Sequence, residues 1–247
     1  MKNYTPLDGL RWSRDSDSAL NNMPQTDVLG RAGGYFLISL PKTIYFNFVS
    51  LPMSQAIKLP VFIGWNVRLI ETHKNILRFP NGIHPLMIRI GYGGSPSLPT
   101  QKSSIRLRGG SLSFLGKARM SAGTIIHVKG NMSIGKDFSS NKNAFLSCTS
   151  EVVIGDNVLL GWNCHILDDN GGHLVLYNGV KSKSDGTIKI GNNVWLCSFS
   201  HLLAGADISD GSIVAYKSLL NKKIEEKNVM VAGSPAVVKR HNVEWCV

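Results

Sequence analysis

Residues 188–220 read IKIGNNVWLCSFSHLLAGADISDGSIVAYKSLL, and this stretch decides the fold. A large apolar residue returns at every sixth position, at Ile190, Leu196, Leu202, Ile208, Val214 and Leu220, and the residues two places earlier are mostly small. A period of six fits neither an α-helix, with about 3.6 residues per turn, nor a plain strand, whose side chains alternate. It predicts short flat strands joined by tight corners, each pointing one large and one small side chain inward.

The same period runs through earlier parts of the chain. It returns at Ile154, Leu160 and Ile166, and before them at Ala122, Val128, Ile134, Ser140 and Leu146. The step from Leu146 to Ile154 is eight residues, so two extra residues are expected at one corner. Three strands close one coil, and neighbouring coils stack at the ordinary strand spacing of about 4.8 Å. The pattern therefore predicts an all-β fold, a parallel β-helix, because accidental spacing in a β-sandwich would not keep its phase over two blocks.

The charge of the chain is concentrated in one region. The 247 residues carry a net charge of +11, and residues 34–140 alone hold 13 basic and two acidic side chains. An excess confined to one segment argues against a nucleic-acid-binding protein. The four cysteines contain no CxxC pair, and the N-terminus has no apolar segment typical of a secretory signal. We therefore expect a cytoplasmic protein.

The composition divides the chain into four zones. Residues 1–33 predict an irregular N-terminal arm, and the basic, aromatic residues 34–103 predict a region that caps the β-helix. The coils are expected over residues 104–222, with a protruding loop at 167–187, and residues 223–247 form a C-terminal tail. The basic, aromatic zone also suits an anionic or lipid-linked glycan, or peripheral contact with the inner membrane, and capping is compatible with both.

Several motifs resemble one enzyme family. Ile154-Gly155-Asp156-Asn157-Val158, Ile190-Gly191-Asn192-Asn193-Val194 and Ala232-Gly233-Ser234-Pro235-Ala236 resemble the hexapeptide-repeat acyltransferases. That resemblance implies a left-handed parallel β-helix, a homotrimer and active sites between subunits. The segments 166–173 and 241–245 look most like O-acetyltransferases of bacterial cell-surface polysaccharides. The resemblance thus implies acetyl transfer from acetyl-CoA, as co-substrate, to a sugar hydroxyl.

The resemblance places the catalytic base on His173, in the loop where the six-residue period fails. An imidazole suits this task because its unperturbed pKa of about 6.5 lets it accept a hydroxyl proton at neutral pH. Asp168 and Asp169 are both near enough in sequence to orient the ring. Relatives usually have one residue between the second polar position and His, whereas Gly171 and Gly172 intervene here. The alternative is a solvated loop histidine, with both carboxylates capping turns.

Further candidates follow from the resemblance. Trp195, Trp162 and Asn170 are candidate substrate-binding residues, with surface packing as the alternative for the tryptophans. Coenzyme A would lie along the last coils, where the candidate contacts are Ala215, Ser218, Lys222, Gly233, Ser234, Lys239 and Arg240. The alternative for the basic residues among them is an ordinary solvated edge.

Three histidines raise a competing zinc hypothesis. His127, His165 and His201 each precede a large inward residue, so each points outward. The 38-residue step from His127 to His165, less the two-residue insertion, spans two coils and predicts that they share a face. Two coils separate them by about 9–10 Å, too far for one ion within a subunit, so we expect no metal. The sequence is also compatible with a small sugar or antibiotic as acceptor, and with a non-catalytic β-helix scaffold.

Overall fold

The computed structural model describes residues 31–94, 99–173, 176–181 and 185–246. The expected N-terminal arm lies almost entirely outside the described residues. The chain divides into two compact units, Met1–Ile38 and Ser39–Val247. The second unit carries the β-helix and every candidate site residue.

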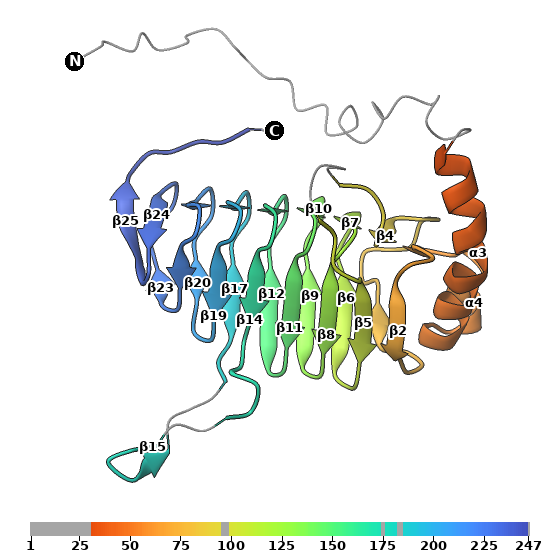
Figure 1. Cartoon of the computed structure of the whole chain (residues 1–247), viewed down its shortest axis with the longest axis horizontal. Helices are drawn as coiled ribbons and strands as arrows, with labels where there is room; N and C mark the ends of the chain where they lie inside the picture. Colours follow the sequence, from red (N-terminus) through yellow and green to blue (C-terminus); the bar gives the residue numbers. More distant parts are fainter. Residues whose placement is uncertain (1–30, 95–98, 174–175, 182–184, 247) are drawn as a thin grey trace, which may run out of the picture. The chain divides into compact units, whose positions relative to one another are not determined.

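Three large sheets, which we call A, B and C, form the β-helix of the second unit (Figure 1). Sheet A contains β1 (Val61–Ile63), β4 (Ile88–Ile90), β7 (Ala118–Met120), β10 (Phe138–Ser140), β13 (Leu159–Leu160), β18 (Trp195–Leu196), β21 (Ile213–Val214), β24 (Met230–Gly233) and the antiparallel β25 (Ala236–Arg240). Sheet B contains β2 (Arg68–Glu71), β5 (Ser104–Leu107), β8 (Ile125–Val128), β11 (Phe145–Cys148), β14 (His165–Leu167), β19 (His201–Leu203) and β22 (Leu219–Leu220). Sheet C contains β3 (Leu77–Arg78), β6 (Ser111–Phe114), β9 (Asn131–Ile134), β12 (Glu151–Ile154), β17 (Ile188–Ile190), β20 (Asp207–Ile208) and β23 (Lys223–Ile224).

The chain visits sheets A, B and C in turn, so each circuit is one coil of a parallel β-helix. The predicted fold class, a left-handed parallel β-helix with an N-terminal extension, is confirmed. The inward residues of the six-residue period form its core: Ile154, Leu160, Ile166, Ile190, Leu196, Leu202, Ile208, Val214 and Leu220 are all buried.

The limits of the β-helix differ from the prediction. Sheets A, B and C already include strands from Val61 onward, so the coils start well before residue 104, and residues 61–94 are not part of a separate cap. The period is hidden there because the segments 79–87, between β3 and β4, and 91–103, between β4 and β5, are long and contain proline. At the other end, β23 and β24 continue the coils into the expected tail, and β25 then reverses direction.

The coils also differ in length. Phe145 pairs with Ile125 and with His165, and the coils from β6 to β14 have 20 residues, whereas Trp195 pairs with Ile213, 18 residues on. The sequence predicted a single two-residue insertion, but every coil of this earlier part carries one. In consequence His127 pairs with Ser147. His127 and His165 do lie on the same outward surface of sheet B, but in neighbouring columns.

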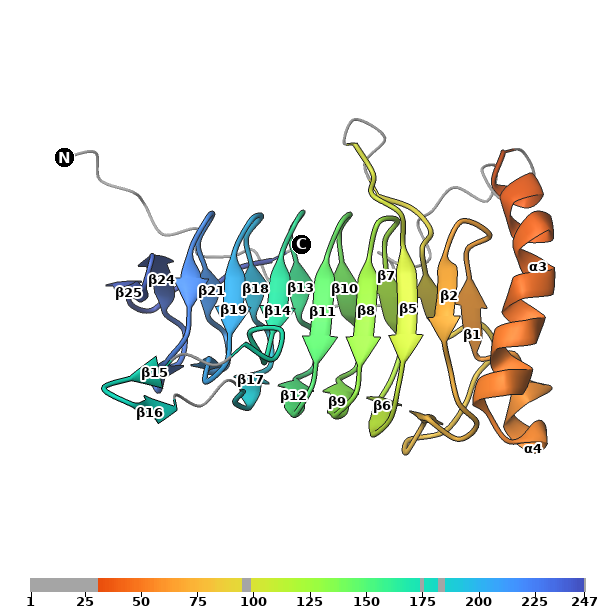
Figure 2. The same cartoon turned by 60° about the horizontal axis from the view of Figure 1, so that its bottom comes forward.

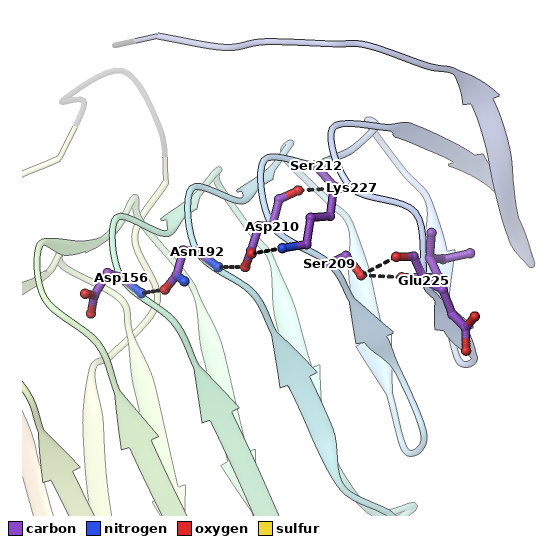
Figure 3. A network of polar contacts seen from close by, with 8 residues as sticks. Asp156, Asn192, Ser209, Asp210, Ser212, Glu225 and Lys227 are labelled. Carbon is purple, nitrogen blue, oxygen red and sulfur yellow. Dashed lines mark hydrogen bonds and ion pairs between the residues drawn. The ribbon is translucent and has the colours of Figure 1, made fainter.

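The motif Ile154–Asn157 and its counterparts at 190–193 and 208–211 lie at the corner between sheets C and A, where their side chains bind one coil to the next (Figure 3). Asn192 Oδ1 accepts the N–H of Asp156, and Asp210 Oδ1 accepts the N–H of Asn192, both at 2.8 Å. Lys227 Nζ donates to Asp210 Oδ2 at 2.9 Å, and this bond above all lowers the pKa of the Asp210 carboxyl. These motifs therefore stabilise the stacking of successive coils.

Helix α3 (Arg31–Ser50) protects the first edge of sheet A with its residues after Ser39 (Figure 2). Thr43 Oγ1 accepts the N–H of Ile63 at 3.0 Å and donates to its carbonyl at 3.2 Å. Asn47 does the same for Val61, at 3.1 Å and 2.6 Å. These two buried side chains, one helical turn apart, replace a missing neighbouring strand at an edge that would otherwise attract another chain.

Candidate active site

The predicted loop leaves the β-helix between β14 and β17, at the corner between sheets B and C. It carries the hairpin β15 (Leu176–Tyr177) and β16 (Val180–Lys181), which stands away from the coils (Figure 1). Gly171 and Gly172 both have positive φ angles, 78° and 82°, so they supply a turn that other residues would resist. His173 follows this turn and is exposed. Its ring makes no hydrogen bond or ion pair with any other described residue.

Asp168 anchors the start of the loop. Its side chain is fully buried, and its two carboxylate oxygens accept the N–H groups of Thr149 and Ser150, each at 2.7 Å. Its own carbonyl accepts the N–H of Gly186 at 3.0 Å, which closes the loop at its base. The carboxylate therefore faces the preceding coil and not His173, and the prediction that it orients the imidazole is not supported.

Asp169 belongs to the turn that leads to His173. Its Oδ1 accepts the N–H of Gly171 at 2.6 Å, and its backbone bridges to that of Asp185 on the returning side of the loop. The next residue, Asn170, is exposed. Of the two candidate carboxylates, only Asp169 shapes the segment that carries the histidine.

Trp195 lies on the outward surface of sheet A. It is half-buried and pairs with Leu159 on one side and Ile213 on the other. Its ring is 6.2 Å from that of Trp245, whose Nε1 donates to the Asn193 carbonyl at 2.7 Å. The sequence did not assign Trp245 a place, because it follows the last repeat and no period positions it.

Trp162 lies at the corner between sheets A and B, within an exposed aromatic ridge. The ridge consists of Trp162, Phe199 and Tyr216, from three successive coils. Phe199 donates its N–H to the Trp162 carbonyl at 2.8 Å, and its ring meets that of Tyr216 edge-on at 5.6 Å. Phe199 and Tyr216 were missed by the sequence analysis.

The backbone at Phe199 is unusual. It has a φ of 60°, at a corner position that other coils fill with Gly123, Asn143, Asn163 or Lys217. Glycine and asparagine tolerate this left-handed conformation, whereas a bulky aromatic residue rarely adopts it. Such local strain is often found at functional sites. The pairing of the strands is needed to see that Phe199 occupies this corner position, so the sequence pattern did not show it.

The candidate coenzyme contacts gather on the last coils, with one correction. Ser218 is buried, and its Oγ accepts the N–H of Gly233 at 3.1 Å, so its hydroxyl serves the core and does not face a ligand. Ala215 is half-buried between β21 and the ridge. The remaining candidates, Lys222, Gly233, Ser234, Lys239 and Arg240, are exposed.

The three histidines and Phe145 form a series of ring contacts across two neighbouring columns of sheet B. Phe145 lies between His127, at 5.6 Å, and His165, at 5.8 Å, and His201 follows His165 at 4.7 Å. Burial lowers the pKa of His127 and of His165, aided by the charges of Arg106 and His201 respectively. Within the described part of the chain, no three His, Cys, Asp or Glu side chains are grouped to hold a metal ion.

Comparisons with known proteins add relatives. No protein-family model matches the chain. It is 36% identical to the galactoside O-acetyltransferase of Escherichia coli over 112 residues, which is 44% of this chain and 54% of that protein. It is 33% identical over 119 residues, 46% of this chain and 58% of the relative, to a putative acetyltransferase of Saccharomyces cerevisiae.

These relatives are named acetyltransferases. A third relative, an uncharacterised 24.8 kDa protein in a cps region of Klebsiella pneumoniae, is 34% identical over 135 residues, 49% of this chain and 60% of that protein. The chain thus spans little more than half the length of the curated relatives it matches. Among solved structures, the polySia-specific acetyltransferase NeuO aligns with 76% of this chain and 71% of its own, at a TM-score of 0.43 and 15% identity.

Proposed function

We propose that this protein is an acetyl-CoA-dependent O-acetyltransferase that modifies a sugar hydroxyl, with His173 as its general base. The observation that carries the proposal is an exposed histidine on a loop that leaves the β-helix, in a chain whose named relatives are acetyltransferases. The acceptor hydroxyl gives its proton to the imidazole while its oxygen attacks the thioester carbonyl. The carbon–sulfur bond then breaks, and the imidazolium returns the proton to the departing thiolate.

We propose a homotrimer with its active sites between chains. Sheet A is opposite the corner from which the loop leaves, so one chain does not bring His173 and Trp195 together. The outward surface of sheet B is unusually apolar for an exposed sheet, with Ile125, Phe145, Leu167, Leu203 and Leu219 among its half-buried residues. The outward surface of sheet C instead carries Glu151, Lys189, Asp207 and Lys223.

If three copies meet through sheet B, we propose that each site lies where two chains adjoin. Each sheet B is bounded by the loop corner on one side and by the aromatic ridge corner on the other. Around a three-fold axis, the loop corner of one chain then lies beside the ridge corner of the next. His173 of one chain would thus act on ligands held near Trp162 and Trp195 of its neighbour, with coenzyme A along Ala215 and the exposed residues of the last coils.

The first test removes the proposed general base. We expect His173→Ala to lower acetyl transfer by at least about a hundredfold, without changing the oligomer measured by light scattering. His84→Ala, an exposed histidine of the first coils, is the matched control and should retain full activity. Retained activity in His173→Ala would overturn the assignment.

Mixing the variants tests the position of the site. When His173→Ala and Trp195→Ala chains are co-expressed in equal amounts, about a quarter of the sites receive an intact histidine from one chain and an intact tryptophan from the next. Recovery of activity toward that fraction is expected. No recovery would place both residues in one chain and refute the intersubunit site.

For the acceptor we propose a bacterial surface polysaccharide or its precursor, and for the location the cytoplasm. The relative from a cps region and the four free cysteines, which suit a reducing compartment, support this choice. An acceptor screen with acetyl-CoA should favour oligosaccharides over simple galactosides. Equal rates on small sugars would favour the alternative of a small acceptor. If the protein neither transfers the acetyl group nor hydrolyses acetyl-CoA, a non-catalytic scaffold is favoured.

A further inference from the structure

Five large apolar side chains are exposed on the helices that cover the first coil. They are Ile44, Tyr45 and Phe48 on α3 and Met53 and Ile57 on or directly after α4 (Met53–Ala56), and their exposed fractions run from 39% to 65%. We call them the N-terminal apolar face. The other side of α3 is buried against the coil through Thr43, Phe46, Asn47 and Ser50. The helix is therefore two-sided, and large apolar side chains exposed together on one side of a helix are typical of an interaction site.

The stretch of sequence that carries this face contains no acidic residue. Residues 28–70 contain no Asp or Glu. Lys58 is exposed directly after Ile57, and Arg78 lines the same shallow depression as Pro52 and Gln55. The nearest acid in sequence, Glu71, is neutralised by Arg108 Nε at 3.0 Å and by Arg106 Nε at 3.5 Å.

We propose that the N-terminal apolar face docks on an anionic lipid surface. An apolar helical face with aromatic side chains and adjacent basic residues is the pattern of peripheral membrane helices, which combine shallow insertion with attraction to acidic headgroups. No helix in the described residues is long and apolar enough to cross a membrane.

A second copy of the chain fits this face less well. Two such faces brought together would set Lys58 and Arg78 of each copy against those of the other, and residues 28–70 offer no acidic side chain to pair them. Lys42 is not part of the charge that attracts lipid. Its Nζ donates to the carbonyls of Trp65 and Val67, and burial lowers its pKa.

The experiment is flotation of the full chain with lipid vesicles. We expect binding to vesicles of phosphatidylcholine with 30% phosphatidylglycerol, weak binding to pure phosphatidylcholine, and release by 0.5 M NaCl because salt screens the headgroup attraction. The double change Tyr45→Ser and Phe48→Ser should lower binding at least about tenfold. Lys58→Gln should lower it about fivefold.

Two matched controls separate docking from general stickiness. Val180→Ser removes an even more exposed apolar side chain from the hairpin, and Lys136→Gln removes an exposed charge at a distant corner. Both should bind vesicles like the unchanged chain. Thermal midpoints of all variants are compared, because exposed substitutions should leave the fold intact.

Three results would overturn the proposal. They are equal binding to both vesicle types, binding that survives the double change, and no binding at all. Concentration-dependent association that the double change abolishes would identify a second copy as the occupant instead. None of these outcomes depends on acetyl transfer, so the docking proposal and the proposed activity fail independently.

Discussion

Asp168 provides the sharpest test of how the loop is built. Its carboxylate accepts two N–H groups at 2.7 Å in a fully buried position. Hydrogen bonds to a charged group contribute about 1.5–3 kcal/mol each, and a buried donor left without an acceptor is costly. Asp168→Asn keeps the shape of the side chain but leaves one backbone N–H facing an amide N–H₂, so we expect the free energy of unfolding to fall by about 2–3 kcal/mol. Asp168→Ala removes both acceptors and should lower the free energy of unfolding by about 3–5 kcal/mol.

Thermal unfolding at a fixed protein concentration measures these losses. For a chain of this size about 1 kcal/mol lowers the midpoint by roughly 2–4 °C, so Asp168→Asn should melt roughly 5–10 °C lower. Asp169→Asn is the control, since its carboxylate accepts a single N–H in a more open turn, and its midpoint should fall by only a few degrees. Acetyl transfer by Asp168→Asn, assayed well below its midpoint, should stay within a few-fold of normal. An unchanged midpoint combined with a collapse of kcat would refute the anchoring role and return Asp168 to the catalytic group.

Two further predictions concern the edge cap and pH. Asn47→Ala should lower the free energy of unfolding by about 2–4 kcal/mol, because it leaves the N–H and carbonyl of Val61 without partners. Amide hydrogen exchange should become faster at Val61 first, and unchanged exchange there would contradict the role of Asn47 at this edge. Because burial lowers the pKa of His127 and His165, the unfolded chain binds protons first as pH falls below about 6.5. Stability should therefore be full above that pH and decline below it, and His127→Phe should flatten the decline seen in thermal midpoints; an unaltered profile would exclude His127 as its source.

The sequence predicted the core of the β-helix because burial demands apolar side chains at a fixed period. Ile190, Leu196 and Leu202 could be assigned to the interior from spacing alone, and all are buried. The start at Val61 could not be assigned in this way, since long corners with proline interrupt the period before residue 104. The 20-residue coils were missed for a related reason, because extra corner residues do not disturb the apolar pattern of each strand.

The candidate site was predicted less completely than the core. His173 stays a prediction of the resemblance, which places the catalytic base in the loop where the six-residue period fails. The role of Asp168 depends on backbone N–H groups 18 and 19 residues earlier, which the sequence does not display. Phe199 and Trp245 were missed because their places depend on the corner register and on the returning tail.

The position of Asp168 also explains why the loop can leave the coil where it does. In the earlier coils, the corner after sheet B is closed by the next coil: the Cys148 carbonyl accepts the N–H groups of Lys129 and Gly130, at 2.7 and 3.1 Å. The N–H groups of Thr149 and Ser150 have no such carbonyl from a following coil, because the loop leaves the β-helix there. Asp168 directly follows Leu167, which pairs with Ser147, so it continues the column of buried apolar residues that ends at Cys148. Its carboxylate accepts the two N–H groups that a backbone carbonyl accepts one coil earlier. A buried acid in an apolar column is therefore what allows the β-helix to release a loop, and His173 with it, without leaving a corner unsatisfied.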